Sequence, residues 1–418
     1  MNAAPSDAQR PGAIEASRVR RTLALCAAAA LFEGFDNQSM GVAAPMVFRE
    51  YSIAPSQAGV IFSAATLGLF FGAAIGGRVA DHLGRRHTLM LSLLLFGVFS
   101  LLTSLVHTTQ MLAITRLLTG LGCGSAMPAF IAMASEAVDP RRRLSAVTLV
   151  MAALPFGGAL AGVMALGDRL GWGWRSIFIV GGLAPILAAL AVPIAFRQAH
   201  SGNQAANAAL AAPSHEVARV GAILWGARRA RTTLLLWTGF FFTQLVLFLM
   251  LNWLPSLIVG LGFSRAQASL ASIGFNLAGS LGAASLGRFH AGARRRLWVI
   301  LTYGGITAAL MGLVAMASYG RFFPAAVLAS SIAGIFIIGA QLILFALAPL
   351  YYSTANRGTG VGAAVAMGRL GSVVGPLFAA TVLAAGSGSA MVLAGIVPFV
   401  LVAGAAALAL TWQAQSAE

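Results

Sequence analysis

Two carboxylates stand three positions apart in a segment that is otherwise apolar. The stretch "LFEGFDNQSM" at residues 31–40 carries Glu33 and Asp36 and follows a largely apolar run. A charge at the bilayer centre costs at least ~2.5–3.5 kcal/mol on insertion scales. Positions three apart on a helix are neighbours, and two close carboxylates away from water resist ionising together. The pair is suited to binding and releasing a proton, and we expect Asp36 to carry it, with Glu33 as the alternative.

Arginines within apolar segments are candidate counter-charges. Arg116 and Arg369 each lie several residues inside such a segment, and a guanidinium offers a planar, bidentate fit to a carboxylate. We predict that Arg116 binds an anionic substrate or is the standing partner of Glu33 or Asp36, two roles that are compatible. Arg369 is predicted to contact the substrate, although helix packing at "GRLG" explains it equally well. A pairing that only locks helices together is the structural alternative for the acids.

Uncharged polar side chains within apolar segments complete the candidate site, because a transport cavity needs a few hydrogen-bonding groups among apolar walls. We predict substrate contacts for Gln38, for Asn252 because Pro255 follows it, and for Gln341 within "AGIFIIGAQ". The remaining side chains of this kind are each more typical of a tie between helices: Asn37, Gln244, Asn276 and Tyr303.

The composition identifies the elements that must hold these residues. The 418 residues are 59% hydrophobic and 9% charged, against about 25% charged in a soluble domain. The mean hydropathy is +0.85. These values predict an integral membrane protein, and long continuous apolar runs favour helices over a barrel. Cys26 and Cys123 lie in apolar runs, which argues against a disulfide framework or a metal site. The polar N-terminal segment predicts no cleaved signal peptide.

Twelve spans are predicted, in two halves of six, as an all-α membrane fold. They cover 22–47, 56–80, 88–107, 110–136, 144–167, 174–196, 232–260, 266–287, 297–318, 323–350, 359–384 and 388–411. The corresponding divisions are an N-terminal tail 1–21, an N-terminal half 22–196, a linker 197–231 with a surface helix at 216–229, a C-terminal half 232–411 and a C-terminal tail 412–418.

The basic residues predict the orientation. The net charge is +16, and all 27 basic residues are arginines, spread between spans rather than gathered on one domain as a nucleic-acid binder requires. Arginine-rich connections alternate with connections that hold single arginines, which places both termini in the cytoplasm by the positive-inside rule. The rich connections contain Arg85, Arg86, Arg141 to Arg143, Arg197, Arg219, Arg228, Arg229, Arg231, Arg294 to Arg296 and Arg357.

The loop after the second span carries a spaced motif, G-x-x-x-D-x-x-G-R-R. Its members are Gly77, Asp81, Gly84, Arg85 and Arg86. An acid beside arginines can hold two helices together, whereas a plain basic anchor is the alternative. The motif resembles the signature loop of the major facilitator superfamily, which implies a gating role. A weaker echo, "LGRFHAGARRR", follows the eighth span without the acid. Such a repeat between halves indicates a secondary transporter with its site near the midplane.

Further segments narrow the resemblance. They are "RLLTGLGCG", "MPAFIAMASEAVDPRRR", "NWLP" and "YYSTANRGTGVGAAVAMGRLGSVVGP", together with the acid pair. The chain resembles the aromatic acid:proton symporter family, and Glu33 in place of the usual first aspartate is most similar to its phenylpropanoid uptake branch. The resemblance implies import of an aromatic carboxylate with protons. "LPFGGALAG" lacks the Gly-Pro pair typical of antiporters, which favours uptake.

The predicted function is therefore proton-coupled import of an aromatic carboxylate across the bacterial inner membrane. The alternatives are transport of another organic anion, proton-coupled export, and a membrane sensor or scaffold. An enzyme is not expected, because no nucleophile with its base and no cluster of metal ligands is present. We expect no cofactor other than the coupling proton, no nucleic-acid partner, and a monomer in the lipid bilayer.

Overall fold

The computed structural model describes residues 11–139, 142–195, 220–226, 229–289, 295–320, 322–352 and 357–415. Within these ranges the chain is helical, as predicted, because hydrocarbon offers no partner to an unpaired backbone group. The helices of the first half are α1 (Pro11–Glu50), α2 (Pro55–Leu83), α3 (Arg85–Thr103), α4 (Thr109–Glu136), α5 (Arg143–Leu166) and α6 (Arg175–Ala195), with the short 3-10 turn η2 (Gly167–Leu170).

The remaining helices follow the linker. They are α8 (Val220–Trp225), α9 (Ala230–Gly260), α10 (Arg265–Phe289), α11 (Arg295–Tyr319), α12 (Phe323–Leu347), the 3-10 turn η3 (Ala348–Tyr351), α13 (Arg357–Ala384), α14 (Ser389–Gly395) and α15 (Val397–Gln415). Each predicted span corresponds to one helix, except that α14 and α15 together form the last. Gly386, with a φ of 78°, lies in the predicted break between the last two spans.

Some boundaries differ from the prediction. Helix α1 begins at Pro11 and ends at Glu50, so it extends beyond the predicted span at both ends. Of the predicted surface helix at 216–229, the structure describes α8, and most of the linker lies outside the described residues. Ten helical segments in the described chain are long and apolar enough to cross a membrane. Helices α1 and α10 are not among them, since α1 carries the acid pair and α10 is rich in serine and glycine.

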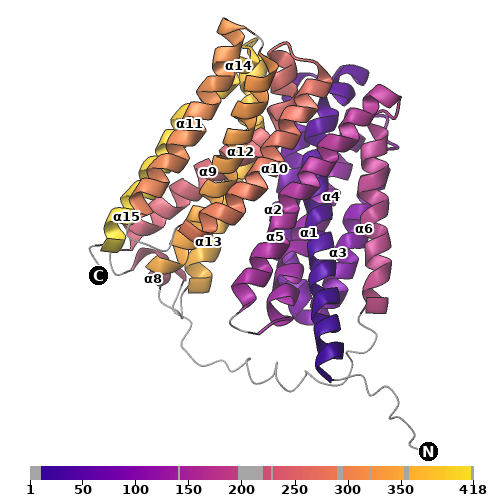
Figure 1. Ribbon diagram of the computed structural model, residues 1–418, viewed down its shortest axis with the longest axis vertical. Helices are drawn as coiled ribbons and strands as arrows, with labels where there is room; N and C mark the ends of the chain where they lie inside the picture. The colour runs from indigo at the N-terminus through magenta and orange to yellow at the C-terminus, as the bar shows by residue number, and fades with distance from the viewer. Residues whose placement is uncertain are drawn as a thin grey trace, which may run out of the picture.

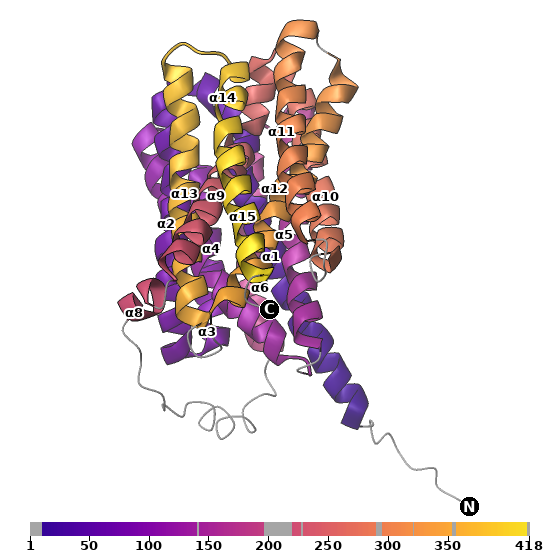
Figure 2. The ribbon, with the colours of Figure 1, turned by 90° about the vertical axis from the view of Figure 1, so that its left-hand side faces the viewer.

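The helices form two groups that lie side by side, one from each half of the sequence (Figure 1). The start of α1 and the end of α15 lie at the same end of the bundle (Figure 2), which we call the terminal end. At the opposite end, residues 51–54 connect α1 to α2. The two groups approach each other at the opposite end and diverge toward the terminal end (Figure 1).

Glycines allow the helices that hold the site to cross closely. A Cβ at Gly34 of α1 would overlap the Leu154 carbonyl of α5, and one at Gly157 would overlap the Leu31 carbonyl. Gly371 and Gly375 of α13 likewise contact the backbone of α9. Small residues are the usual means of close helix approach in membranes. The crossing of α1 with α5 therefore lies at the acid pair itself.

Candidate functional site

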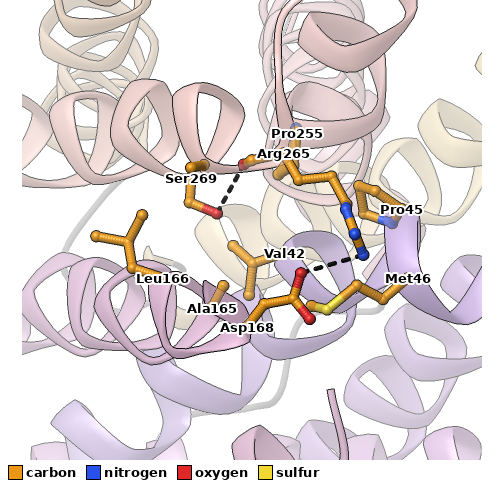
Figure 3. Close-up of a pocket in the computed structure, with 10 residues that line it drawn as sticks. Val42, Pro45, Met46, Ala165, Leu166, Asp168, Pro255, Arg265 and Ser269 are labelled. Atoms are coloured by element: carbon orange, nitrogen blue, oxygen red, sulfur yellow. Dashed lines mark hydrogen bonds and ion pairs between the residues drawn. The ribbon is translucent and has the colours of Figure 1, made fainter. Parts of the chain in front are cut away.

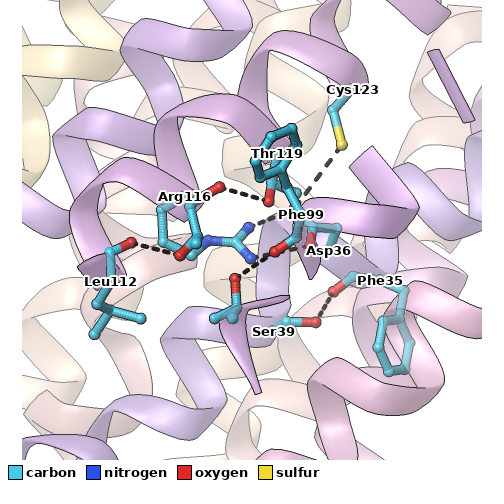
Figure 4. A network of polar contacts seen from close by, with 10 residues as sticks. Phe35, Asp36, Ser39, Phe99, Leu112, Arg116, Thr119 and Cys123 are labelled. Atoms are coloured by element: carbon cyan, nitrogen blue, oxygen red, sulfur yellow. Dashed lines mark hydrogen bonds and ion pairs between the residues drawn. The ribbon is translucent and has the colours of Figure 1, made fainter. Parts of the chain in front are cut away.

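Asp36 and Arg116 form a buried ion pair between α1 and α4. Arg116 Nη1 donates to Asp36 Oδ1 at 3.2 Å, and Nη2 donates to Oδ2 at 2.5 Å. The two side chains are 3% and 2% exposed. Figure 4 shows the guanidinium directed at the carboxylate from the facing helix. A bidentate arrangement adds geometric specificity to charge, so the standing acid–arginine partnership considered from the sequence is present, with Asp36 as the acid.

Two further side chains contact this ion pair. The Cys123 thiol lies about two turns along α4 from Arg116 and donates to Asp36 Oδ2 at 3.9 Å. The Arg116 Cζ atom lies 5.5 Å from the centre of the Phe178 ring of α6. Both contacts were missed from the sequence, because the pairing of α4 with α1 and α6 depends on packing that no local pattern specifies. Cys123 and Cys26 are free thiols, and the described residues hold no cluster of metal ligands.

Glu33 differs from Asp36 in its surroundings. Its side chain is fully buried, and within the described part of the chain neither carboxyl oxygen has a hydrogen-bond partner. An isolated buried carboxylate is costly in free energy, and such groups become neutral instead. The two acids, one turn apart on α1, are therefore in different environments: one is matched by an arginine and the other is without any bonded counter-charge.

Arg369 of α13 is the cation that acts on Glu33 electrostatically from the other half. Its guanidinium is half-buried, and Nη2 lies 3.5 Å from the Met127 sulfur of α4. A thioether is a weak acceptor, so this contact leaves the capacity of the guanidinium for carboxylates largely unused. Arg369 thus reaches across the interface between the halves, while the glycines of "GRLG" on either side of it pack against α9 within its own half.

The polar residues predicted to contact substrate are not all brought together. Gln38 Nε2 donates to the Leu251 carbonyl of α9 at 2.9 Å and to Ser272 Oγ of α10 at 3.0 Å, so it ties α1 to the second half. The Asn252 amide donates to Phe248 of its own helix at 2.7 Å. Gln341 lies half-buried on α12. Their roles in substrate binding stay predictions.

The residues of the predicted gating loop lie at the terminal end. Arg85 forms an ion pair with Glu136, which links α3 to α4, and Arg86 donates to the Pro193 carbonyl of α6 at 2.9 Å. Gly84 has a φ of 81°, a conformation that glycine adopts without strain. The side chain of Asp81 lies outside the described residues. The acid that pairs with Arg85 is thus distant in sequence and was not predicted.

Contacts between the halves gather at the opposite end. The rings of Phe48, Phe62 and Trp253 form a cluster from α1, α2 and α9, with centroids 5.1 to 6.1 Å apart. Trp253 Nε1 also donates to the Pro376 carbonyl of α13 at 3.1 Å. Ser63 of α2 donates to the Val373 carbonyl at 2.8 Å. The ring cluster and the Ser63 hydrogen bond join the two halves, whereas the Trp253 hydrogen bond ties α9 to α13 within the second half. None of these contacts was anticipated from the sequence.

An ion pair adds to this closure beside a small pocket. Arg265 Nη1 of α10 lies 3.1 Å from Asp168 Oδ2, which follows α5. The pocket beside it is lined by residues of α1, α5, α9 and α10, including Met46, Leu166 and Pro255. Figure 3 shows Asp168 and Arg265 facing each other across it. Because both partners are half-exposed, the pair is a surface contact that can open at low cost.

The two helical halves are in contact at one end, and buried charged residues lie on helices at their interface. This organisation is that of a membrane transporter rather than an enzyme. The sequence profile of the Major Facilitator Superfamily matches residues 26–376. The chain therefore belongs to the Major Facilitator Superfamily and is a multi-pass membrane protein.

Named relatives and solved structures resemble the chain over most of its length. The chain is 40% identical over 391 residues to the 3-(3-hydroxy-phenyl)propionate transporter of Escherichia coli (strain K12), covering 93% of each chain. It is 31% identical to the 4-hydroxybenzoate transporter PcaK of Pseudomonas aeruginosa, covering 90% of this chain and 89% of the relative. A bacterial homologue of the human lysosomal transporter Spinster superposes with a TM-score of 0.67 at 17% identity, covering 93% of this chain and 96% of that one. The last likeness concerns the fold alone.

Proposed function

We propose that the protein imports an aromatic carboxylate together with protons by alternating access. Support for the cargo comes from relatives named for 3-(3-hydroxy-phenyl)propionate, 4-hydroxybenzoate and gallate. Support for an anion site comes from Arg369, a half-buried cation at the interface of the halves whose guanidinium contacts the Met127 thioether. A guanidinium in that position suits a carboxylate.

The single observation that carries the proton coupling is the contrast between the two acids. Asp36 is engaged by Arg116, whereas Glu33 is fully buried with both oxygens unpartnered in the described chain. A group that is neutral when enclosed and ionised when water reaches it loads and releases a proton as access alternates. The acid pair is thus the proposed coupling site, and this geometry favours Glu33 as the carrier over Asp36, the residue preferred from the sequence.

Arg116 and Arg369 have different roles in this proposal. Arg116 holds Asp36 and keeps α1 and α4 in register, while Arg369 binds the substrate carboxylate near Glu33. Protonation of Glu33 removes the negative charge that acts on Arg369, and the substrate carboxylate supplies a counter-charge to Arg369 in its place, so that no charge at the interface is left unpaired. Closing the halves around a site without net charge costs less desolvation energy. Substrate and proton therefore favour the same transition, which is the requirement for symport.

The proposed orientation places both termini in the cytoplasm of a bacterial inner membrane. The arginine distribution supports it, and the contacts of Trp253 and Asp168 then close the outer face. Gln38 contributes to that closure through Leu251 and Ser272. Asn252 and Gln341 stay candidate substrate contacts, the coupling proton is the only proposed cofactor, and the proposed unit is a monomer. Another organic anion as cargo and proton-coupled export are the competing functions.

Uptake into right-side-out membrane vesicles tests the proposal. Labelled 3-(3-hydroxyphenyl)propionate and 4-hydroxybenzoate are supplied with an imposed gradient, acidic outside, and accumulation is followed with and without a protonophore. We expect accumulation above the external concentration that the protonophore abolishes. Accumulation that does not depend on the gradient would exclude proton symport, and uptake of aliphatic but not aromatic acids would replace the proposed cargo.

A further inference from the structure

Gln244 is a buried amide that the transport scheme has not used. It lies on α9 and is 2% exposed. Its carbonyl oxygen Oε1 has no hydrogen-bond partner among the described residues. A buried amide oxygen without a donor loses the hydrogen bonds that it would make to water, which costs free energy. A donor supplied by a ligand would remove that cost.

The position of Gln244 directs it toward the interface of the halves. Residues seven apart lie on the same face of a helix, and Leu251, seven residues after Gln244, accepts the hydrogen bond from Gln38 of α1. Gln244 therefore shares the face of α9 that meets the first half, two turns closer to the terminal end. This is the direction in which the two groups of helices diverge (Figure 1).

Gln244 also lies beside the proposed carboxylate site. A Cβ at Gly368 of α13 would lie 3.0 Å from Gln244 Cγ, so the Gln244 side chain packs against the residue that directly precedes Arg369. Arg369 in turn acts on Glu33 from across the interface. The region thus combines a guanidinium suited to a carboxylate with an amide oxygen that lacks a donor, on two helices that contact each other closely.

We infer that Gln244 determines substrate specificity by accepting a hydrogen bond from a ring hydroxyl of the aromatic acid, whose carboxylate Arg369 binds. The inference rests on the proposed function. A site built to bond a hydroxyl discriminates strongly against the analogue that lacks it, because the buried acceptor is then left unpaired. The protein should accordingly prefer hydroxylated aromatic acids over their unsubstituted counterparts, and Gln244 should be the origin of that preference.

The test compares two acids that differ by one hydroxyl, 3-(3-hydroxyphenyl)propionate and 3-phenylpropionate. Gln244→Met keeps the length of the side chain but removes the acceptor. We expect the wild-type protein to favour the hydroxylated acid in kcat/KM, and Gln244→Met to lower that ratio by about tenfold, the effect of losing one buried hydrogen bond. The KM for the hydroxylated acid should rise because its hydrogen bond is lost, whereas 3-phenylpropionate should be transported at least as well as before because no buried acceptor is left unpaired.

Thr243→Val is the matched control. It removes the neighbouring buried polar group, whose hydroxyl lies 2.9 Å from the Tyr303 hydroxyl within the second half, so it should affect both acids equally. Gln244→Ala, measured by the same ratio, decides the question if Gln244→Met does not accumulate in the membrane. An unchanged ratio in the Gln244 variants would overturn the inference while leaving the transport function intact. Absence of uptake of both acids by the wild-type protein would instead refute the proposed function.

Discussion

At the scale of single residues, the distinction between Asp36 and Glu33 matters most. Both lie on α1, three residues apart. Asp36 accepts two hydrogen bonds from Arg116, whereas Glu33 has no hydrogen-bond partner in the described chain. Breaking a buried ion pair by removing one member leaves an uncompensated charge, whereas removing both leaves none. The Asp36–Arg116 pair should therefore behave as a unit that holds α1 against α4.

A double-mutant cycle tests that unit. Asp36→Leu and Arg116→Met should each lower the free energy of unfolding by about 3–5 kcal/mol, while the double variant should be destabilised by much less than the sum. The measurement is unfolding of purified protein in mixed detergent micelles. If the losses of stability in the two single variants add up in the double variant, or if the single variants are as stable as the wild type, the pair is not coupled as described.

The sequence allowed part of this residue-level picture to be predicted. The pairing of Arg116 with an acid of the first span could be predicted, because a cation deep inside a membrane span needs an anion near it. The choice of Asp36 over Glu33 as that partner did not follow, since it depends on the rotation of α1 against α4. The same applies to Arg85, whose partner Glu136 lies at the far end of another helix.

At the scale of elements, close helix crossings place these side chains. The crossing of α1 with α5 occurs where Gly34 and Gly157 meet the backbone of the opposite helix. The membrane-spanning helices themselves could be predicted, because continuous apolar runs and arginine-rich gaps are local signals. The ring cluster of Phe48, Phe62 and Trp253 could not, because it brings three distant segments together in a register that only packing determines.

Gly34→Ala should displace α1 from α5, because no space exists for a Cβ against the Leu154 carbonyl. We expect a loss of stability of about 1–3 kcal/mol or more, typical of overpacking, and transport reduced at least tenfold because Glu33 and Asp36 flank the crossing. Gly304→Ala on α11 is the control, since its added Cβ would meet nothing within 4 Å. Normal uptake and normal thermal stability of Gly34→Ala would contradict the close crossing of α1 with α5.

At the scale of the whole molecule, the halves are joined at the end opposite the termini. Asp168 and Arg265 bridge them there, together with the ring contacts of Trp253 and the hydrogen bonds of Gln38. A half-exposed ion pair contributes roughly 0–1 kcal/mol, which corresponds to a shift of up to about fivefold between two conformations. The pair is thus suited to bias the closed state without preventing it from opening.

Removal of this bridge should expose the pocket at that end. In a protein with Ser269→Cys, a pocket-lining position, Asp168→Asn should raise labelling by a membrane-impermeant maleimide about two- to fivefold. Asp139→Asn, an exposed acid near the terminal end, is the control and should leave labelling unchanged. Equal labelling with and without the Asp168 substitution would show that this ion pair does not help to close that end.

The central claim is that Glu33 carries the coupling proton while Asp36 holds the structure, and counterflow separates the two roles. In proteoliposomes, Glu33→Gln mimics the permanently protonated acid, so it should exchange labelled for unlabelled aromatic acid yet fail to accumulate it along an imposed pH gradient. Asp36→Asn should lose both activities, because Arg116 is left unpaired. Gradient-driven accumulation by Glu33→Gln at the wild-type level would contradict the account.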